Sequence, residues 1–165
     1  MLGEGGLVLD KFTVTLECKV PPPMVALVAA AVSWALARWT PAWTVGGTWL
    51  PVASWCLAGA GVGIGLWSLW YFRRAGTTFD PHVPQRTRVF VEAGPYRYSR
   101  NPMYLGLACL LLAWCARLAH PLALVGVALF VAYISRFQIA PEERVLREKF
   151  GEAYLRYCAR VRRWL

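Results

Sequence analysis

The chain has 165 residues, which is room for one domain, and 58% of them are hydrophobic, including nine tryptophans. A mean hydropathy of +0.41 exceeds what the core of a soluble domain requires, so the composition excludes an ordinary soluble protein and indicates a bilayer as solvent. The net charge of +9 would suit nucleic acid, but no nucleic-acid-binding motif accompanies it, so we expect no such partner.

Four apolar stretches follow one another along the chain. A helix needs about 20 largely apolar residues to cross a hydrocarbon core of about 30 Å. We therefore predict an all-α, polytopic membrane protein with transmembrane helices at residues 23–39, 49–72, 102–119 and 121–139. The third is short, and His120 with Pro121 turns the last two into a tight helical hairpin.

The basic residues indicate how the chain crosses the membrane. All of them except Arg38 and Arg117 lie in the lead-in (1–22), in the loop at 73–101, or after residue 135. Because cytoplasmic segments carry the excess of Lys and Arg, we predict that both termini and this loop face the cytosol. The lead-in contains Glu4, Asp10 and Glu17 and lacks the basic start of a signal peptide, so we expect it to be a cytosolic segment of the same single domain.

Apolar residues recur every three or four positions at 141–165, where we predict an amphipathic cytosolic helix that is eased at Gly151. Within the second span, the stretch GAGVGIG at 59–65 does not match a nucleotide-binding glycine loop and has no strand before it. We interpret it as close helix packing through Gly59 with Gly63 and Gly61 with Gly65. Close approach of a ligand to this surface is the alternative.

The segment GPYRYSRNPMYLG at 94–106 places polar and cationic residues at the start of the third span. Asn101 followed by Pro102 is a helix-start signal, since Asn caps free amides and Pro suits the first helical position. The helix N-terminus together with Arg97 and Arg100 suits a carboxylate or phosphate. The competing interpretation is that these are ordinary arginines and tyrosines of a span end.

Glu142 and Glu143 follow Pro141 in the first turn of the last predicted helix, where the helix dipole favours acidic residues in any case. Their functional interpretation is that they accept hydrogen bonds from hydroxyl or ammonium groups of a ligand. Neighbouring residues diverge by about 100° on a helix, so we expect only one of the two to face a pocket. A metal site is not expected, because His82 and His120 lie on opposite sides of the membrane and no ligand spacing is present.

GPYRYSRNPMYLG, the hairpin and the segment EERVLREKFGEAYLRYCARV together resemble the integral-membrane S-adenosylmethionine-dependent methyltransferases. The likeness is to the isoprenylcysteine carboxyl methyltransferases and phospholipid methyltransferases, and it extends from the second span onward. It implies a helical membrane fold with a cytosolic pocket for S-adenosyl-L-methionine. Because that pocket would lie at a span end beside apolar helix faces, we expect a lipophilic methyl acceptor whose carboxylate, thiol or amine is methylated.

By position, the resemblance implies cofactor contacts for Tyr96, Arg100, Asn101, Tyr104, Gly106, Leu107, Glu142 and Glu143, and also for Arg156 and Tyr157. Catalytic roles fall on Arg100, Asn101 and Glu142. Asn101 stands where many members of the family have His; an amide still donates and accepts hydrogen bonds but carries no titrating charge.

Two other classes of function stay open on the sequence. One is an NADPH-dependent membrane reductase, since sterol reductases resemble this family in their C-terminal helices. The other is a non-catalytic membrane partner that keeps the fold. The acceptor, the oligomeric state and the identity of the ligand-facing glutamate also stay open.

Overall fold

Helices make up the regular structure of the part of the chain that is described. The computed structural model describes residues 17, 19–74 and 91–165, and within those ranges every regular element is helical. Short 3-10 turns, η1 (Pro41–Trp43), η3 (Gly94–Arg97) and η4 (Pro121–Ala123), and one π-helical segment, η5 (Ser135–Ile139), link the α-helices. The α-helices of the described residues are α2 (Pro22–Trp39), α3 (Trp49–Arg74), α4 (Pro102–Leu118), α5 (Leu124–Ile134) and α6 (Ala140–Arg160). The predicted all-α class is confirmed, while most of the lead-in and of the 73–101 loop lies outside the described residues.

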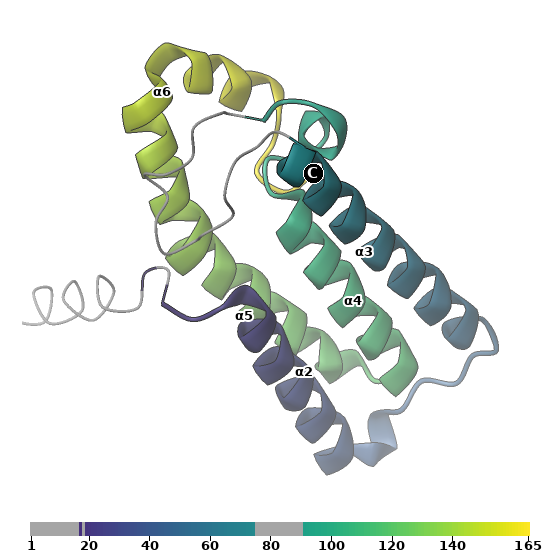
Figure 1. The fold of residues 1–165 in the computed structure, drawn as a ribbon. Coiled ribbons are helices and arrows are strands. Elements are labelled where there is room, and N and C mark those ends of the chain that lie inside the picture. The colour runs from purple at the N-terminus through teal and green to yellow at the C-terminus, as the bar shows by residue number, and fades with distance from the viewer. Residues whose placement is uncertain (1–16, 18, 75–90) are drawn as a thin grey trace, which may run out of the picture.

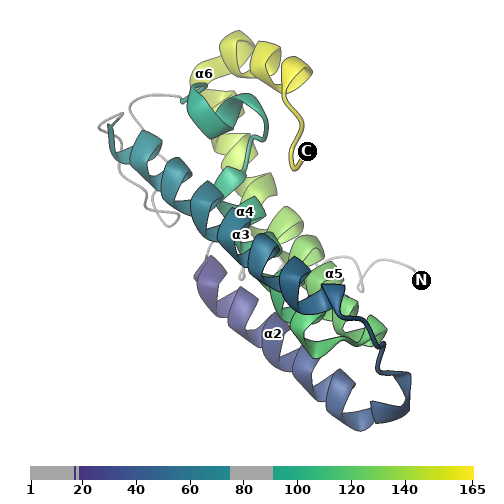
Figure 2. The same ribbon diagram turned by 90° about the vertical axis from the view of Figure 1, so that its right-hand side faces the viewer.

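The helices α2 to α5 lie side by side as a bundle (Figure 1). The closest neighbours are α3 with α4 and α2 with α5, and α4 also contacts both α2 and α5. In the view turned by 90°, α6 extends beyond the bundle and bends back over the end where η3 lies (Figure 2). That end carries the polar segments on which the sequence analysis places the site.

The outer faces of the bundle are apolar. Three helical stretches, Pro22–Trp39, Trp49–Arg74 and Pro121–Arg160, are long and apolar enough to cross a membrane, and α4 is a shorter apolar helix of 17 residues. Leu27, Trp55 and Leu66 are 64%, 78% and 63% exposed on these helices. Large exposed apolar surface of this kind marks contact with lipid or with a partner. The chain is therefore a polytopic helical membrane protein, as predicted.

Glycines set the close approach of α3 and α4. A Cβ added at Gly61 would lie 2.8 Å from the Gly106 carbonyl oxygen, and one added at Gly106 would lie 2.9 Å from the Gly61 carbonyl oxygen. Gly65 contributes its backbone to the same contact, at 3.3 Å from the Gly106 position. The packing expected of Gly61 is confirmed, and Gly65 takes part through its backbone alone, since a Cβ added at Gly65 itself would meet nothing within 4 Å. The packing expected of Gly59 and Gly63 is wrong, because these two face the other side of α3 with nothing within 4 Å.

A buried polar group ties α2 to the hairpin at the end of the bundle away from η3. Ser33 is fully buried and donates to the carbonyls of Ala29 and Ala123, at 3.0 and 2.7 Å. His120 Nε2 lies 2.7 Å from the carbonyl oxygen of Thr40. Ala119 ends α4 in a left-handed conformation (φ 52°), and Pro121 then begins η4. The predicted hairpin break at His120 and Pro121 is confirmed.

The helical stretch does not break before the last helix, contrary to the boundary placed between 139 and 141. Instead, α5 runs through the π-helical η5 into α6. Pro141 has no N–H to donate to the carbonyl one turn earlier, and its ring crowds that carbonyl. A π-helical segment just before it, from Ser135 to Ile139, widens the turn, which lets the helix pass the proline.

The last helix kinks at Gly151, which has φ 49° and ψ −125°, so the predicted easing at this glycine is confirmed. Only glycine adopts such a conformation readily. The helix ends at Arg160, however, and the tail (residues 161–165) is not helical. The prediction that this helix continues to residue 165 is therefore wrong, because the tail makes its hydrogen bonds to residues 99–101 instead.

Candidate functional site

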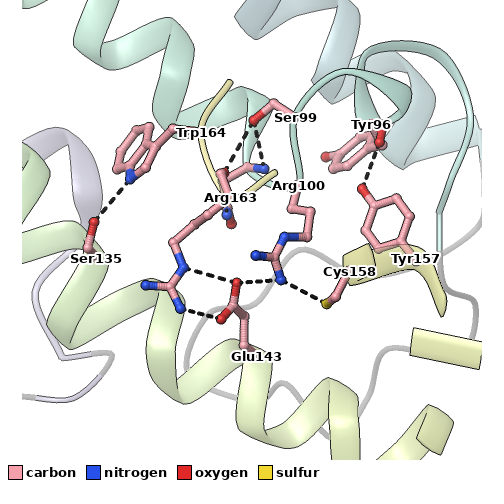
Figure 3. Close-up of polar contacts among 10 residues, drawn as sticks. Tyr96, Ser99, Arg100, Ser135, Glu143, Tyr157, Cys158, Arg163 and Trp164 are labelled. Atoms are coloured by element: carbon pink, nitrogen blue, oxygen red, sulfur yellow. Dashed lines mark hydrogen bonds and ion pairs between the residues drawn. The ribbon is translucent and has the colours of Figure 1, made fainter. Parts of the chain in front are cut away.

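The site lies where four segments meet: residues 96–101, the start of α4, the start of α6 and the tail. Figure 3 shows two arginines from different segments meeting at the carboxylate of Glu143 on α6. Arg100 reaches this carboxylate from the segment before α4, and Arg163 reaches it from the tail. We call this set Arg100, Glu143 and Arg163 the charged cluster.

Two members of the charged cluster, Arg100 and Glu143, are largely shielded from solvent, whereas the Arg163 side chain is 40% exposed. Arg100 Nη1 lies 3.0 Å from Glu143 Oε1, and the two side chains are 15% and 11% exposed. Arg163 grips the same carboxylate at both oxygens, with Nε 3.2 Å from Oε1 and Nη2 2.6 Å from Oε2. These hydrogen bonds, above all, raise the pKa of the Arg163 guanidinium above its usual range. Both oxygens of Glu143 are thus engaged by protein cations.

Arg100 is held through its Nη1, whereas its Nε makes no hydrogen bond. Besides Glu143, its Nη1 donates to the Cys158 sulfur at 2.7 Å. Its Nε is buried and has no hydrogen-bond partner. An unmade buried hydrogen bond costs about 1 to 3 kcal/mol, so this N–H is a donor to which a bound ligand would restore a partner.

Glu142 has different surroundings from its neighbour. The Tyr104 hydroxyl donates to Glu142 Oε1 at 2.7 Å, and within the described ranges no Lys or Arg forms an ion pair with this carboxylate. Burial raises the pKa of Glu142 from 4.5 to about 7; the Tyr104 hydrogen bond opposes this shift and the charge of Glu143 adds to it. Glu142 is therefore poised between its protonated and ionised forms near neutral pH.

Tyr96 joins this part of the site. Its carbonyl oxygen accepts a hydrogen bond of 2.7 Å from the Tyr157 hydroxyl, which ties η3 to α6. Burial, with smaller contributions from Tyr157 and Glu142, raises the pKa of the Tyr96 hydroxyl well above its usual range. Tyr96 is thus an uncharged aromatic side chain, and it lies close enough to Glu142 for the charge of that carboxylate to affect its pKa.

Asn101 does not cap α4 through its side chain, so that prediction is wrong, although Pro102 does begin the helix as expected. Its Nδ2 donates instead to the Arg163 carbonyl at 3.0 Å, and its backbone N–H donates to Ser99 Oγ at 3.1 Å. The tail carbonyl needs a donor here, and Asn101 supplies it. The amide therefore secures the tail.

The remaining predicted site residues divide by position. Tyr157 is buried beneath Tyr96, whereas Arg156 is exposed on α6 and lies outside the charged cluster. Gly106 packs against α3, and Leu107 packs against the bundle core. The structure thus gathers Tyr96, Arg100, Asn101, Tyr104, Glu142, Glu143 and Tyr157 around one end of α4.

Sequence reasoning missed the tail. Arg163 completes the charged cluster, and the Trp164 indole donates to Ser135 Oγ of η5 at 3.1 Å. Ser99 and Cys158 were also missed, although each contacts Asn101 or Arg100. The signal was weak, because Val161 and Trp164 continue the spacing of the amphipathic helix and so hide its end.

Fold and site together define a polytopic helical membrane protein with a polar, charged site at one end of its apolar helices. Comparison with known families identifies the protein family, since the phospholipid methyltransferase family model matches residues 49–153. The chain therefore belongs to the phospholipid methyltransferase family, a family of membrane methyltransferases, and the predicted resemblance is confirmed.

One relative adds a sequence match without a function. A Haemophilus influenzae protein described as "Uncharacterized protein" is 52% identical to this chain over 63 residues. The match covers the whole of that protein and 38% of this chain.

Proposed function

We propose that this protein transfers a methyl group from S-adenosyl-L-methionine to a lipophilic acceptor, a carboxylate, thiol or amine of a lipid-like molecule, at the cytosolic face of the membrane. Family membership supports methyl transfer. The observation that carries the choice of cofactor is the contrast between the two glutamates. Glu143 is engaged by two arginines, while Glu142 has a tyrosine hydroxyl and no cation among the described residues.

The side chains at the site fit the groups of this cofactor. Arg100, with its unpartnered buried Nε, suits the carboxylate of the amino-acid part. Glu142 suits ribose hydroxyls or the ammonium group, and Tyr96 offers an aromatic face for the adenine. Neighbouring charges of opposite sign thus match a ligand that carries both signs itself.

When bound, S-adenosyl-L-methionine supplies an activated methyl group on a sulfonium sulfur. The protein's own contribution is to hold the acceptor in line with that methyl and to exclude water, so positioning provides much of the rate. A carboxylate or thiolate acceptor needs no base. An amine acceptor has to lose a proton, and Glu142, with a pKa of about 7, is a carboxylate at the site suited to take it.

The acceptor reaches the site from the bilayer in this proposal. The site lies at the end of helices whose exposed side chains are apolar, among them Leu110 on α4 and Leu129 on α5. A lipid tail would rest against such faces while its head group meets the charged end.

Binding and turnover test the proposal together. Purified protein in detergent should bind S-adenosylmethionine and its demethylated product but not NADPH, as measured by calorimetry. With methyl-labelled cofactor, label should enter one class among extracted native lipids, prenylcysteine analogues and small thiols. NADPH binding without S-adenosylmethionine binding would favour a reductase, and faster methylation of a fully polar acceptor than of any amphiphile would contradict access from the bilayer.

A further inference from the structure

We infer that Arg163 is a positioning residue, which fixes how Arg100 presents its guanidinium to an anionic ligand beside the start of α4. Arg163 lies in the tail, outside the residues 49–153 that match the family. The inference rests on the proposed function, because the anion is the carboxylate of the cofactor. Arg163 acts through Glu143.

The tail is held firmly enough for such a role. It runs beside the segment before α4, and its polar groups bond to that segment and to η5. These bonds join Arg100 N to Arg162 O (3.0 Å), Asn101 Nδ2 to Arg163 O (3.0 Å), Ser99 Oγ to Arg163 O (3.4 Å) and Trp164 Nε1 to Ser135 Oγ (3.1 Å). The backbone of Arg163 is therefore anchored on one side and the following indole on the other.

The Glu143 carboxylate is divided unequally between its two arginines. Arg163 forms the two-pronged pair, with Nε on one oxygen and Nη2 on the other. Arg100 contributes only Nη1, at 3.0 Å, and its buried Nε has no partner. In a planar guanidinium, Nε and Nη2 share the edge that grips carboxylates in two-pronged pairs. That edge of Arg100 is left for a second carboxylate.

Removing Arg163 would change this division. Glu143 would keep a single arginine, and a carboxylate with one arginine favours the two-pronged arrangement, which is shorter and stronger. Arg100 would then turn its Nε edge toward Glu143, and the ligand would lose it. Arg163 thus keeps Arg100 available by occupying Glu143.

The test separates positioning from folding by comparing two ligands. S-adenosylhomocysteine carries the amino-acid carboxylate, whereas 5′-methylthioadenosine lacks the whole amino-acid group. In calorimetry on the full chain in detergent, Arg163→Ala should bind S-adenosylhomocysteine about tenfold or more weakly, as for a lost charge-assisted hydrogen bond. Its affinity for 5′-methylthioadenosine should equal that of the parent. The affinity of Arg163→Lys for S-adenosylhomocysteine should fall between those of the parent and of Arg163→Ala, because a single ammonium covers the Glu143 carboxylate less completely.

The matched control is Arg162→Ala, because Arg162 is exposed and its described contact is made by its backbone carbonyl. It should bind both ligands like the parent. In addition, Arg163→Ala combined with Glu143→Gln should bind S-adenosylhomocysteine no more weakly than Glu143→Gln alone, since Arg163 acts through Glu143. Additive losses would contradict that route.

Three further outcomes would overturn the inference. Equal weakening for both ligands would show that Arg163 has only a structural role. Unchanged or tighter binding of S-adenosylhomocysteine by Arg163→Ala would show that the tail does not position Arg100 for the ligand. If Arg163→Ala does not fold, Arg163→Lys carries the same comparison. A parent protein that fails to bind S-adenosylhomocysteine would overturn the proposed function as well, and the parent measurement alone distinguishes that case.

Discussion

Glu142 and Glu143 are adjacent in sequence and differ in every contact that decides a role. Glu143 balances two arginines, and its loss would leave the largely buried Arg100 and the partly exposed Arg163 without their carboxylate. Glu142 is bonded to a neutral hydroxyl, so a neutral amide in its place keeps the local packing. The helix geometry that separates the two side chains by about 100° makes this division possible.

We predict that Glu142→Gln folds like the parent but binds S-adenosylmethionine roughly tenfold to a hundredfold more weakly, a loss of about 1.5 to 3 kcal/mol. Glu143→Gln should lower the free energy of unfolding by about 3 kcal/mol, since it breaks a buried ion pair from one side. Calorimetry and thermal unfolding on both variants check this. If the two are equally stable and bind equally well, the division of roles is wrong.

The pKa of Glu142 predicts a pH dependence. Its folded value of about 7 lies above the ordinary 4.5, so between these values the folded protein holds a proton that the unfolded chain has released. The stability from this protonated carboxyl is therefore present at low pH and is lost as pH rises through about 7. An ammonium group needs the ionised form, so cofactor affinity should increase between about pH 6 and pH 8. Calorimetry across this range should give a flat profile for Glu142→Gln, and a parallel rise in that variant would assign the titration to another group.

At the level of elements, the contact between α3 and α4 fixes the base of the site, since α4 carries Tyr104 only half a turn from Gly106. The Cβ of an alanine at position 61 would meet the Gly106 backbone oxygen at 2.8 Å, which is backbone that cannot rotate away. The same substitution at position 63 meets nothing within 4 Å. The two glycines are thus a matched pair on opposite faces of one helix.

We predict that Gly61→Ala destabilises the protein by about 1 to 3 kcal/mol, as overpacking does. Gly63→Ala should be neutral or slightly stabilising, since alanine is the better helix former. Thermal unfolding in detergent measures both. Gly61→Ala should also weaken cofactor binding, because α4 moves. Two alanine variants of equal stability would contradict the close approach at Gly61.

At the scale of the whole molecule, the direction of the chain across the bilayer remains a prediction from its basic residues. The exposed Tyr98 and the exposed Gly46 lie at opposite ends of the bundle, in the segments before α4 and before α3. In a variant without native cysteines, Tyr98→Cys should be labelled only by reagents that enter the cytosol. Gly46→Cys should be labelled from outside, and a Cβ there meets nothing within 4 Å. Labelling of position 98 from outside would show that the topology is the reverse of the predicted one and that the site lies on the other face of the membrane.

The sequence predicted this architecture well, because its signals are local or additive. The length of the apolar stretches predicted the helices, His120 with Pro121 predicted the hairpin, and Gly151 predicted the kink. It also gave the family, through motifs whose order along the chain is preserved. Bilayer solvation makes this possible, since a spanning segment must satisfy its own backbone hydrogen bonds whatever its neighbours do.

Other features depended on contacts between distant segments and were decided only by tertiary structure. Which glycine pair faces α4 depends on the rotation of α3 about its axis, which no local pattern specifies. Asn101 leaves its capping role because a carbonyl 62 positions away in the chain accepts from its amide. The tail leaves the helix for the same reason, and with it Arg163 reaches Glu143. A hydrogen bond or an ion pair between segments depends on where the folded chain places both partners, and the residues of either segment alone do not carry that information.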